Sequence, residues 1–354
     1  MKRDLIFAAA VFALVSINAK ADPLAFTTFV SSSDINAVEG QNNTIAFTYA
    51  GNKFVGSVYF GGSNNQLYST NLSGTGVAKF GTPIPGAGGE VVLAASLGQA
   101  GFAKGDIYAG SQDGGEIWHF SNTGGAPIPF VTSGISGGVR GILFDPGSSF
   151  GGKMLVSTNV GDIYTVDSTG KATLLASVGE DTEGMDIATS AWGSFAGDLL
   201  VDSEGSGHLR LISPSGAVTL LPVTVPIAET VSFVPLNLGS SGNPLEGFYV
   251  ANYPVDIQYA DAADFTGLLG DAIVTSEDGS NARIWDLHYD SGSGTFSASE
   301  FATHLPNQSE DGIFVTAARI TGTGGGSVPE PSSVILLGSV LVGLGAVLRR
   351  RLSA

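Results

Sequence analysis

The chain has 354 residues, a formal net charge of −17, 51 glycines, 15 prolines and no cysteine. An apolar fraction of 43% excludes a disordered tract, the acidic charge argues against a nucleic-acid partner, and the lack of thiols excludes disulfides and zinc-thiolate sites. The high glycine content favours many short strands joined by tight turns.

The N-terminal segment has the three parts of a secretory signal peptide. A basic start precedes an apolar run from Leu5 to Ile17, and the small-residue sequence AKA ends at Ala21. We predict a signal peptide over residues 1–21, cleaved after Ala21, so that the protein leaves the cytoplasm. The alternative is a membrane-anchoring first helix, which is disfavoured because the apolar run is too short to span a bilayer comfortably.

The body of the chain, residues 22–320, repeats a strand pattern about every 46 to 50 residues, with one longer step of about 75. The clearest copies end in a polar turn with glycine, and they read QLYSTNLSG, EIWHFSNTG, DIYTVDSTG, HLRLISPSG and RIWDLHYDSG. Two further strand patterns precede each copy and a fourth follows it. Four short strands per unit, without amphipathic helices between them, predict one all-β domain with the fold of a β-propeller.

Five full units and a partial one predict six blades, with seven as the alternative. We assign DIQYADA to the first strand of the fifth unit and interpret the preceding pair, ETVSFVPLN and GFYVANY, as a shortened blade. The late segment EDGIFVTAARI is expected to pair with an N-terminal strand such as AFTTFV and so close the ring, which removes exposed sheet edges. Equivalent turns are expected to contain Gly56, Gly105, Gly152, Gly197 and Gly270. A β-helix would have a shorter repeat, and a single sandwich would not need this period.

These units resemble the blades of NHL, SMP-30-like (gluconolactonase) and virginiamycin B lyase-like propellers. The resemblance rests on the blade spacing and on strands of the type GDIY. It implies a central channel lined by the first strand of each blade.

Charged residues recur where the first strand of a unit begins. The positions are Glu90, Arg140, Glu183, Glu229 and either Glu310 or Asp311. Carboxylates that converge on a channel rim would suit a hard cation, so we predict a Ca²⁺ site formed by Glu90, Glu183 and Glu229. In the SMP-30-like enzymes, a metal at a comparable place polarises a lactone carbonyl. The alternative is a set of solvated rim charges that Arg140 partly neutralises.

Two other patterns carry no predicted chemistry. Residues Gly134 to Gly138 match G-x-S-x-G, but a nucleophile elbow requires a strand-to-helix turn, and this match lies in a loop between strands. The four histidines lack the spacing of metal ligands, and His119 and His288 are expected to be packing or rim residues.

The C-terminal region begins with a flexible linker over residues 321–327, of sequence TGTGGGS. Pro329, Glu330 and Pro331 follow, and then an uncharged stretch from Ser332 to Leu348. At 1.5 Å per residue a helix over 332–348 would be about 25 Å long, close to the lower limit for crossing a bilayer. The cluster Arg349, Arg350 and Arg351 is expected to stop transfer and to hold the C-terminus in the cytoplasm.

The last segment, residues 328–354, resembles the PEP-CTERM sorting signal of Gram-negative bacteria, because motif, apolar stretch and basic end occur together and in order. The resemblance implies recognition by exosortase, a membrane protease that cuts near the motif, and transfer of the protein to the cell envelope or exterior. It also implies a setting in which extracellular polysaccharide is common. The alternative is a plain C-terminal anchor that is never processed.

Two functional hypotheses follow. The first is a non-enzymatic, secreted or envelope-bound propeller that acts in binding or in the extracellular matrix, since no catalytic constellation emerges. The second is a secreted metal-dependent propeller hydrolase or lactonase, which is supported only by the rim glutamates. The sequence leaves enzymatic activity undecided and favours its absence.

Overall fold

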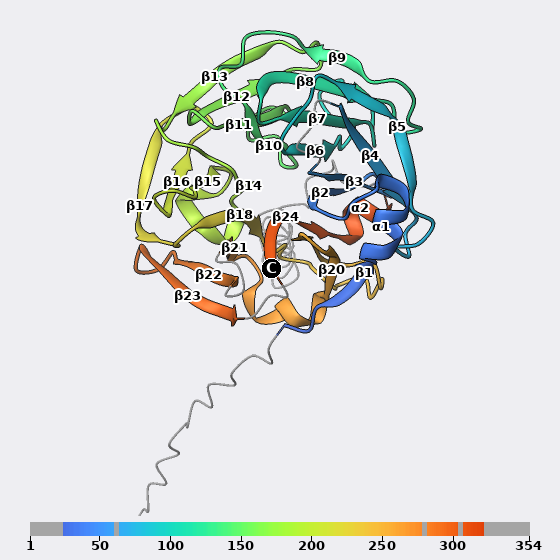
Figure 1. Ribbon diagram of the computed structural model, residues 1–354. Coiled ribbons are helices and arrows are strands. Elements are labelled where there is room, and N and C mark those ends of the chain that lie inside the picture. The colour runs from blue at the N-terminus through green and yellow to red at the C-terminus, as the bar shows by residue number, and fades with distance from the viewer. Residues whose placement is uncertain (1–23, 60–63, 278–281, 304–306, 322–354) are drawn as a thin grey trace, which may run out of the picture.

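The computed structural model describes residues 24–59, 64–277, 282–303 and 307–321. Within them, the strands form six four-stranded antiparallel sheets. Figure 1 shows these sheets arranged in a ring around a central axis. The predicted all-β propeller is therefore confirmed, and it has six blades rather than seven. The predicted signal peptide, its cleavage site at Ala21, and the C-terminal motif and helix lie outside the described residues.

The first four blades are contiguous stretches of chain in which the strands follow one another from the channel outward. Blade 1 consists of β2 (Thr44–Tyr49), β3 (Phe54–Val58), β4 (Asn64–Thr70) and β5 (Ala78–Pro85). Blade 2 consists of β6 (Val91–Ala95), β7 (Ile107–Ser111), β8 (Gly114–Phe120) and β9 (Ile128–Val131). Blade 3 consists of β10 (Val139–Phe144), β11 (Met154–Thr158), β12 (Asp162–Val166) and β13 (Ala172–Ser177). Blade 4 consists of β14 (Met185–Ile187), β15 (Leu199–Ser203), β16 (His208–Ile212) and β17 (Val218–Thr224).

The last two blades are interleaved in the sequence. Blade 5 consists of β18 (Ala228–Phe233), β21 (Ala272–Ser276), β22 (Arg283–Asp290) and β23 (Thr295–Thr303). Blade 6 consists of β24 (Gln308–Val315), β19 (Gly247–Tyr253), β20 (Asp256–Asp261) and β1 (Thr27–Val30). After β18 the chain thus crosses to the next blade, forms the β19–β20 hairpin there, and returns to continue blade 5.

This arrangement corrects our assignment of the fifth unit. ETVSFVPLN contains all but the first residue of β18, the inner strand of blade 5, whereas GFYVANY and DIQYADA form the hairpin of blade 6. The N-terminal and C-terminal strands do close the ring in one blade, but they do not pair with each other, because β19 and β20 lie between them. Strand periodicity identifies a strand but not its neighbour, which explains the error.

Apolar side chains pack between every pair of neighbouring blades, in six clusters. Between blades 6 and 1, for example, Tyr249 packs with Phe47, Phe54 and Tyr68. Full burial of each such side chain stabilises the fold by roughly 1.5–3 kcal/mol. The ring is therefore held together by cores that lie between its sheets.

Helices occupy only connections in the described chain. α1 (Ser32–Glu39) follows β1, and the 3₁₀ helices η1 (Ser190–Phe195) and η2 (Ala262–Leu268) lead into β15 and β21. α2 (Ala317–Thr321) follows β24 directly, and its first N–H, from Ala317, donates to Glu246 Oε1 at 3.0 Å.

The predicted turn glycines mostly occupy one equivalent position, just before the second strand of a blade. Gly105, Gly197 and Gly270 have φ between +77° and +94°, and each donates its N–H at 2.9 Å to the carbonyl of a residue soon after the preceding inner strand. Gly152 lies at the same connection in blade 3. Gly56 is the exception, because it lies inside β3, where the ring of Tyr68 fills the space that a Cβ atom would need.

Candidate functional site: a carboxylate-lined channel mouth

One rim of the channel is formed where inner strands begin and second strands end, because these strands are antiparallel. The backbone N–H of Gln112, after β7, donates to the carbonyl of Glu90, before β6, at 3.1 Å. In blade 5, Glu277 after β21 donates in the same way to Ile227 at 2.9 Å. We call this rim the mouth and define it by Glu90, Gln112, Arg140, Glu183, Glu204, Glu229, Glu277 and Glu310. The opposite rim is called the far end.

Arg140 is the cation at the centre of one side of the mouth. Its Nη1 lies 2.5 Å from Glu90 Oε2, its Nε lies 3.3 Å from Asp181 Oδ1, and its Nη2 pairs with Glu183. Nη1 also donates to Gln112 Oε1 at 3.2 Å. One guanidinium therefore joins acidic groups from blades 2 and 4 and neutralises only part of their charge.

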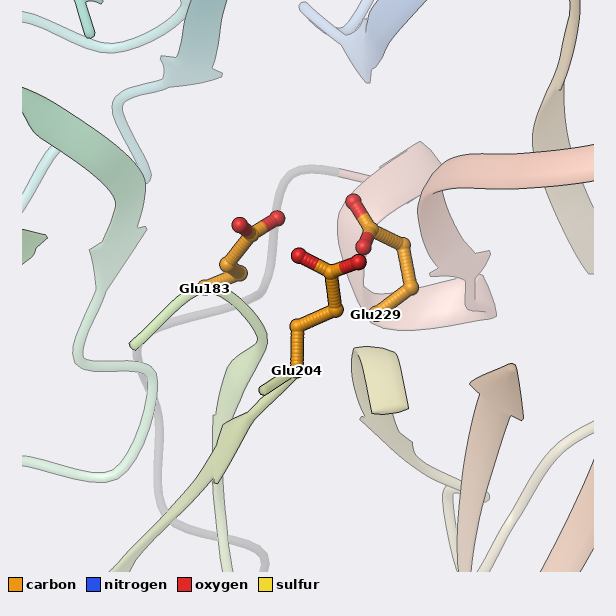
Figure 2. A group of neighbouring side chains, drawn as sticks. All are labelled: Glu183, Glu204 and Glu229. Carbon is orange, nitrogen blue, oxygen red and sulfur yellow. The ribbon is translucent and has the colours of Figure 1, made fainter. Parts of the chain in front are cut away.

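Three carboxyl groups meet on the other side of Glu183. One oxygen from each of Glu183, Glu204 and Glu229 lies within 4.8 Å of the others. Figure 2 shows the three side chains extending toward one another from blades 4 and 5. Glu183 and Glu229 are buried, whereas Glu204 is partly exposed. This group of three, which we call the carboxylate triad, is a compact set of oxygen donors at the mouth.

The carboxyls around the triad bind protons more tightly than usual. Burial, followed by the charges of Glu310 and Glu277, raises the pKa of Glu229 well above its ordinary value. Burial and the neighbouring Glu277 and Glu90 raise the pKa of Glu310 to about 9. Burial also raises the pKa of Asp202, beneath the mouth, to about 7. Neighbouring carboxylates repel one another, and protonation reduces this repulsion where few cations are near. A bound metal cation would reduce it in the same way.

The structure places the predicted residues in two neighbouring sets. Glu183 and Glu229 belong to the triad, whereas Glu90 is outside it and pairs with Arg140. Of the two alternatives at the start of β24, Glu310 joins the acidic group. Asp311 instead accepts the N–H of Phe47 in the next blade at 3.0 Å.

Sequence reasoning missed Glu204 and Glu277. Both come directly after the second strand of a blade, where that strand reaches the mouth. The corresponding residues after β7 and β11 are Gln112 and Asn159. A polar residue at this position in successive units was the available signal.

The channel behind the mouth is a cavity of about 110 Å³. Four glutamates of the mouth line it, namely Glu90, Glu183, Glu229 and Glu310, together with apolar side chains such as Val92 and, at the far end, Arg319 of α2. Burial lowers the pKa of Arg319, while Asp186 and Tyr49 act in the opposite direction. The cavity therefore changes from acidic to basic along its length.

The remaining patterns fit structural roles. The G-x-S-x-G match lies between β9 and β10, where no helix follows a strand, and the N–H of Ser136 donates to the Tyr164 hydroxyl at 3.1 Å. His119 and His288 pair with Asp106 and Asp271 at 2.6 and 2.7 Å. These two pairs lie toward the far end, away from the triad.

The fold and the mouth define the class of the molecule, which is a six-bladed β-propeller with an acidic channel opening. Its C-terminal segment carries the PEP-CTERM protein-sorting motif, whose family matches residues 327–351. This motif implies export and sorting to the cell surface. Within residues 24–59, 64–277, 282–303 and 307–321, none of the helices has the length and apolarity needed to cross a membrane.

Solved structures share the propeller fold at low sequence identity. A catalytically inactive variant of virginiamycin B lyase from Staphylococcus aureus, solved with quinupristin, is 11% identical with a TM-score of 0.50, over 80% of this chain and 75% of that one. A candidate gluconolactonase is 11% identical with a TM-score of 0.49, over 80% and 83% of the two chains. A protein from Lactobacillus plantarum is 13% identical with a TM-score of 0.45, over 78% and 89%. A search of curated proteins finds no match.

Proposed function

We propose that this protein is a cell-surface binding or matrix component whose ligand is held through a Ca²⁺ ion at the mouth. The observation that carries the proposal is the carboxylate triad, whose three oxygens lie within 4.8 Å of one another. Ca²⁺ takes six to eight oxygen ligands at about 2.3–2.6 Å and tolerates irregular geometry, which suits side chains from different strands. Glu183, Glu204 and Glu229 would supply part of this shell.

The ligand would complete the coordination. Three carboxyl groups leave positions for oxygens from outside the protein, and two of them, Glu183 and Glu229, line the channel cavity. Neighbouring hydroxyl or carboxylate oxygens of an extracellular polysaccharide have the required chemistry. The sorting motif supports this choice, because proteins with such a motif are expected where extracellular polysaccharide is made.

The sorting route supports the same setting. We infer that residues 332–348 hold the exported chain in the inner membrane of a Gram-negative cell until exosortase cuts near Pro329, Glu330 and Pro331. The processed protein would then belong to the envelope or the exterior. This route delivers the mouth to a compartment in which Ca²⁺ is available.

Calorimetric titration of the purified protein with Ca²⁺ tests the proposal. We expect one saturable site in the wild type and at least tenfold weaker binding in Glu204→Gln, because this variant keeps the size of the side chain but removes one anionic ligand. Glu116→Gln is the matched control, since Glu116 is exposed and lies outside the triad. Equal Ca²⁺ affinity in all three proteins would contradict the proposal.

One observation favours a second candidate, a metal-dependent hydrolase or lactonase. Glu310 stays protonated at neutral pH beside the triad, so that it can serve as a general acid while the metal polarises a carbonyl. This candidate predicts Ca²⁺-dependent hydrolysis of simple lactones, with kcat reduced in Glu310→Gln. If no turnover is detected with or without Ca²⁺, the enzymatic candidate is excluded and only the binding function remains.

A further inference from the structure

A second, smaller pocket lies at the far end of the channel. It has a volume of about 30 Å³, and its lining includes Tyr49, Ser96, Lys104 and Arg319. Arg319 also lines the main cavity, so its side chain stands between the two spaces. Among the described residues, no acidic side chain lines this pocket.

The cations at the two ends of the molecule are used differently. Near the mouth, Arg140, Arg210 and Arg283 each form an ion pair with a glutamate. In the described part of the chain, Lys104 and Arg319 form no ion pair with a carboxylate. Among the residues described, these two cations therefore share a pocket without a carboxylate, in a chain whose formal charge is −17.

The Arg319 guanidinium is incompletely compensated. Asp186 is the carboxyl that attracts it, but it lies beyond ion-pair distance and already accepts the N–H groups of Ile187 and Phe233 at 2.8 and 2.7 Å. Arg319 is half-buried, so its charge loses part of its contact with water without gaining a close partner, and an anion in the pocket would offset that cost. Arginine is also the side chain whose planar fork best fits a phosphate group.

Ser96 provides a hydroxyl donor beside these cations. Its Oγ accepts the N–H of Gly98 at 3.1 Å, which leaves its own proton for another acceptor. The Tyr49 hydroxyl, by contrast, donates to the carbonyl of Gly51 at 2.6 Å and forms part of the wall. The pocket thus offers two positive groups and one hydroxyl donor around a space of about 30 Å³.

We propose that the far-end pocket is an anion site that binds a phosphate group through Arg319 and Lys104, with Ser96 as a further donor. The proposal is independent of the Ca²⁺ function, since it involves none of the residues of the mouth. The phosphate group could belong to a free phosphate compound or to a lipid headgroup, because the chain continues from this end into its C-terminal segment.

Titration of inorganic phosphate into the full-length chain in maltoside micelles, with EDTA present and ionic strength held constant, tests the proposal. We expect saturable binding that is about tenfold weaker in Arg319→Gln and about threefold weaker in Lys104→Gln. Lys153→Gln should bind as the wild type does, because Lys153 does not line the pocket. The melting temperature of each variant without phosphate identifies any loss of folding.

A second arm separates the two sources of phosphate. Dihexanoyl phosphatidylglycerol, used below its micelle concentration, is titrated in the same way. Binding that depends on Arg319 and competes with inorganic phosphate supports a lipid headgroup, whereas binding of inorganic phosphate alone supports a free compound. The proposal is overturned if phosphate gives no saturable signal beyond chloride, or if a folded Arg319→Gln binds as tightly as the wild type.

Discussion

Glu229 is both a buried carboxyl group and a candidate cation ligand. It is buried, it belongs to the triad, and its pKa is raised by burial and by the charges of Glu310 and Glu277. A carboxylate in this position is unfavourable for the fold unless it holds a proton or a cation. The negative charge of Glu229 therefore lowers the stability of the cation-free fold but favours the binding of a cation.

We predict that Glu229→Gln makes the Ca²⁺-free protein more stable, by about 1 kcal/mol, because it removes one source of like-charge repulsion. The same substitution should abolish the increase in melting temperature that Ca²⁺ gives to the wild type. Thermal unfolding in EDTA and in excess Ca²⁺ measures both effects. A variant that is destabilised in EDTA yet still stabilised by Ca²⁺ would show that Glu229 is not a ligand.

The pH dependence of stability follows from the raised pKa values. Glu310 has an ordinary pKa of 4.5 and a folded pKa of about 9, so the folded protein binds a proton that the unfolded chain releases. This contribution to stability is fully present below about pH 4.5 and is lost as the pH rises through about 9. Glu229, Glu277 and Asp202 act in the same direction.

We therefore expect the melting temperature in EDTA to fall between pH 5 and pH 9, and to fall less in Glu310→Gln. Ca²⁺ should reduce the slope in the wild type, since the cation replaces the protons. Unfolding curves at fixed ionic strength across this pH range provide the measurement. A wild-type melting temperature that rises toward pH 9 would contradict this account of the mouth.

At the scale of single residues, the sequence predicted part of the mouth. The inner-strand glutamates Glu183 and Glu229 were found because their strands repeat with a clear period. Glu204 and Glu277 were missed because they follow second strands, and only strand pairing brings the two sets to one rim. The sequence indicated that Arg140 could neutralise rim charges, but not which ones, because rotamers decide which carboxylates a guanidinium reaches.

Neighbouring blades are joined at the element scale by side chains that bond to the backbone of the next inner strand. Thr48 Oγ1 accepts the N–H of Ala95 at 3.2 Å, Asp186 accepts that of Phe233 at 2.7 Å, and Ser232 donates to the carbonyl of Gly312 at 2.9 Å. These bonds line the channel. There the channel-side edge of each inner strand has no neighbouring strand with which to pair. They fix the spacing of the blades and with it the spacing of the mouth residues.

Close approach of blades 2 and 3 at the mouth depends on Gly138. A Cβ atom added there would lie 1.7 Å from the carbonyl oxygen of Gln112. We predict that Gly138→Ala lowers the free energy of unfolding by about 1–3 kcal/mol, because the two blades must separate. Gly147→Ala is the control, since an added Cβ atom there meets nothing within 4 Å.

Denaturant unfolding of the two variants and the wild type provides the comparison. Equal loss of stability in both variants would mean that chain flexibility, rather than blade contact, explains the effect. Gly138 belongs to the G-x-S-x-G match, so this experiment also tests whether that pattern reflects packing.

The blade pattern was predictable because each unit carries its own strand periodicity and turn glycines. The order of the strands in blades 5 and 6 was not, because β20 alternates as an inner strand does. Its place is fixed by pairing with β19, which precedes it directly in the sequence, and with β1, which lies near the N-terminus. Local pattern cannot distinguish these partners.

At the scale of the whole molecule, the chain has two separable parts, a closed ring and a C-terminal sorting segment. We predict that replacing Pro329, Glu330 and Pro331 by alanine blocks processing and leaves the ring folded, because the glycine-rich linker uncouples the two. The unprocessed protein should remain in the inner membrane. Replacing Arg349, Arg350 and Arg351 should fail differently, since the apolar stretch could then slip through or insert in the wrong orientation.

Mass and cell fractionation of the mature protein, in hosts with and without exosortase, measure the outcome. Retention of the full C-terminus through Ala354 in both hosts would identify the segment as a plain anchor.

The position of α2 shows from which end of the ring the chain continues into its C-terminal segment. β24 begins at the mouth, where Glu310 lies, and runs through the ring to the far end, where α2 ends at Thr321. The C-terminal segment is therefore joined to the ring at the far end, on the side opposite the triad. A ring that is held from this end would present the mouth on the side away from the point of attachment. Long polymers outside the cell could then reach the opening without passing between the protein and the surface that carries it.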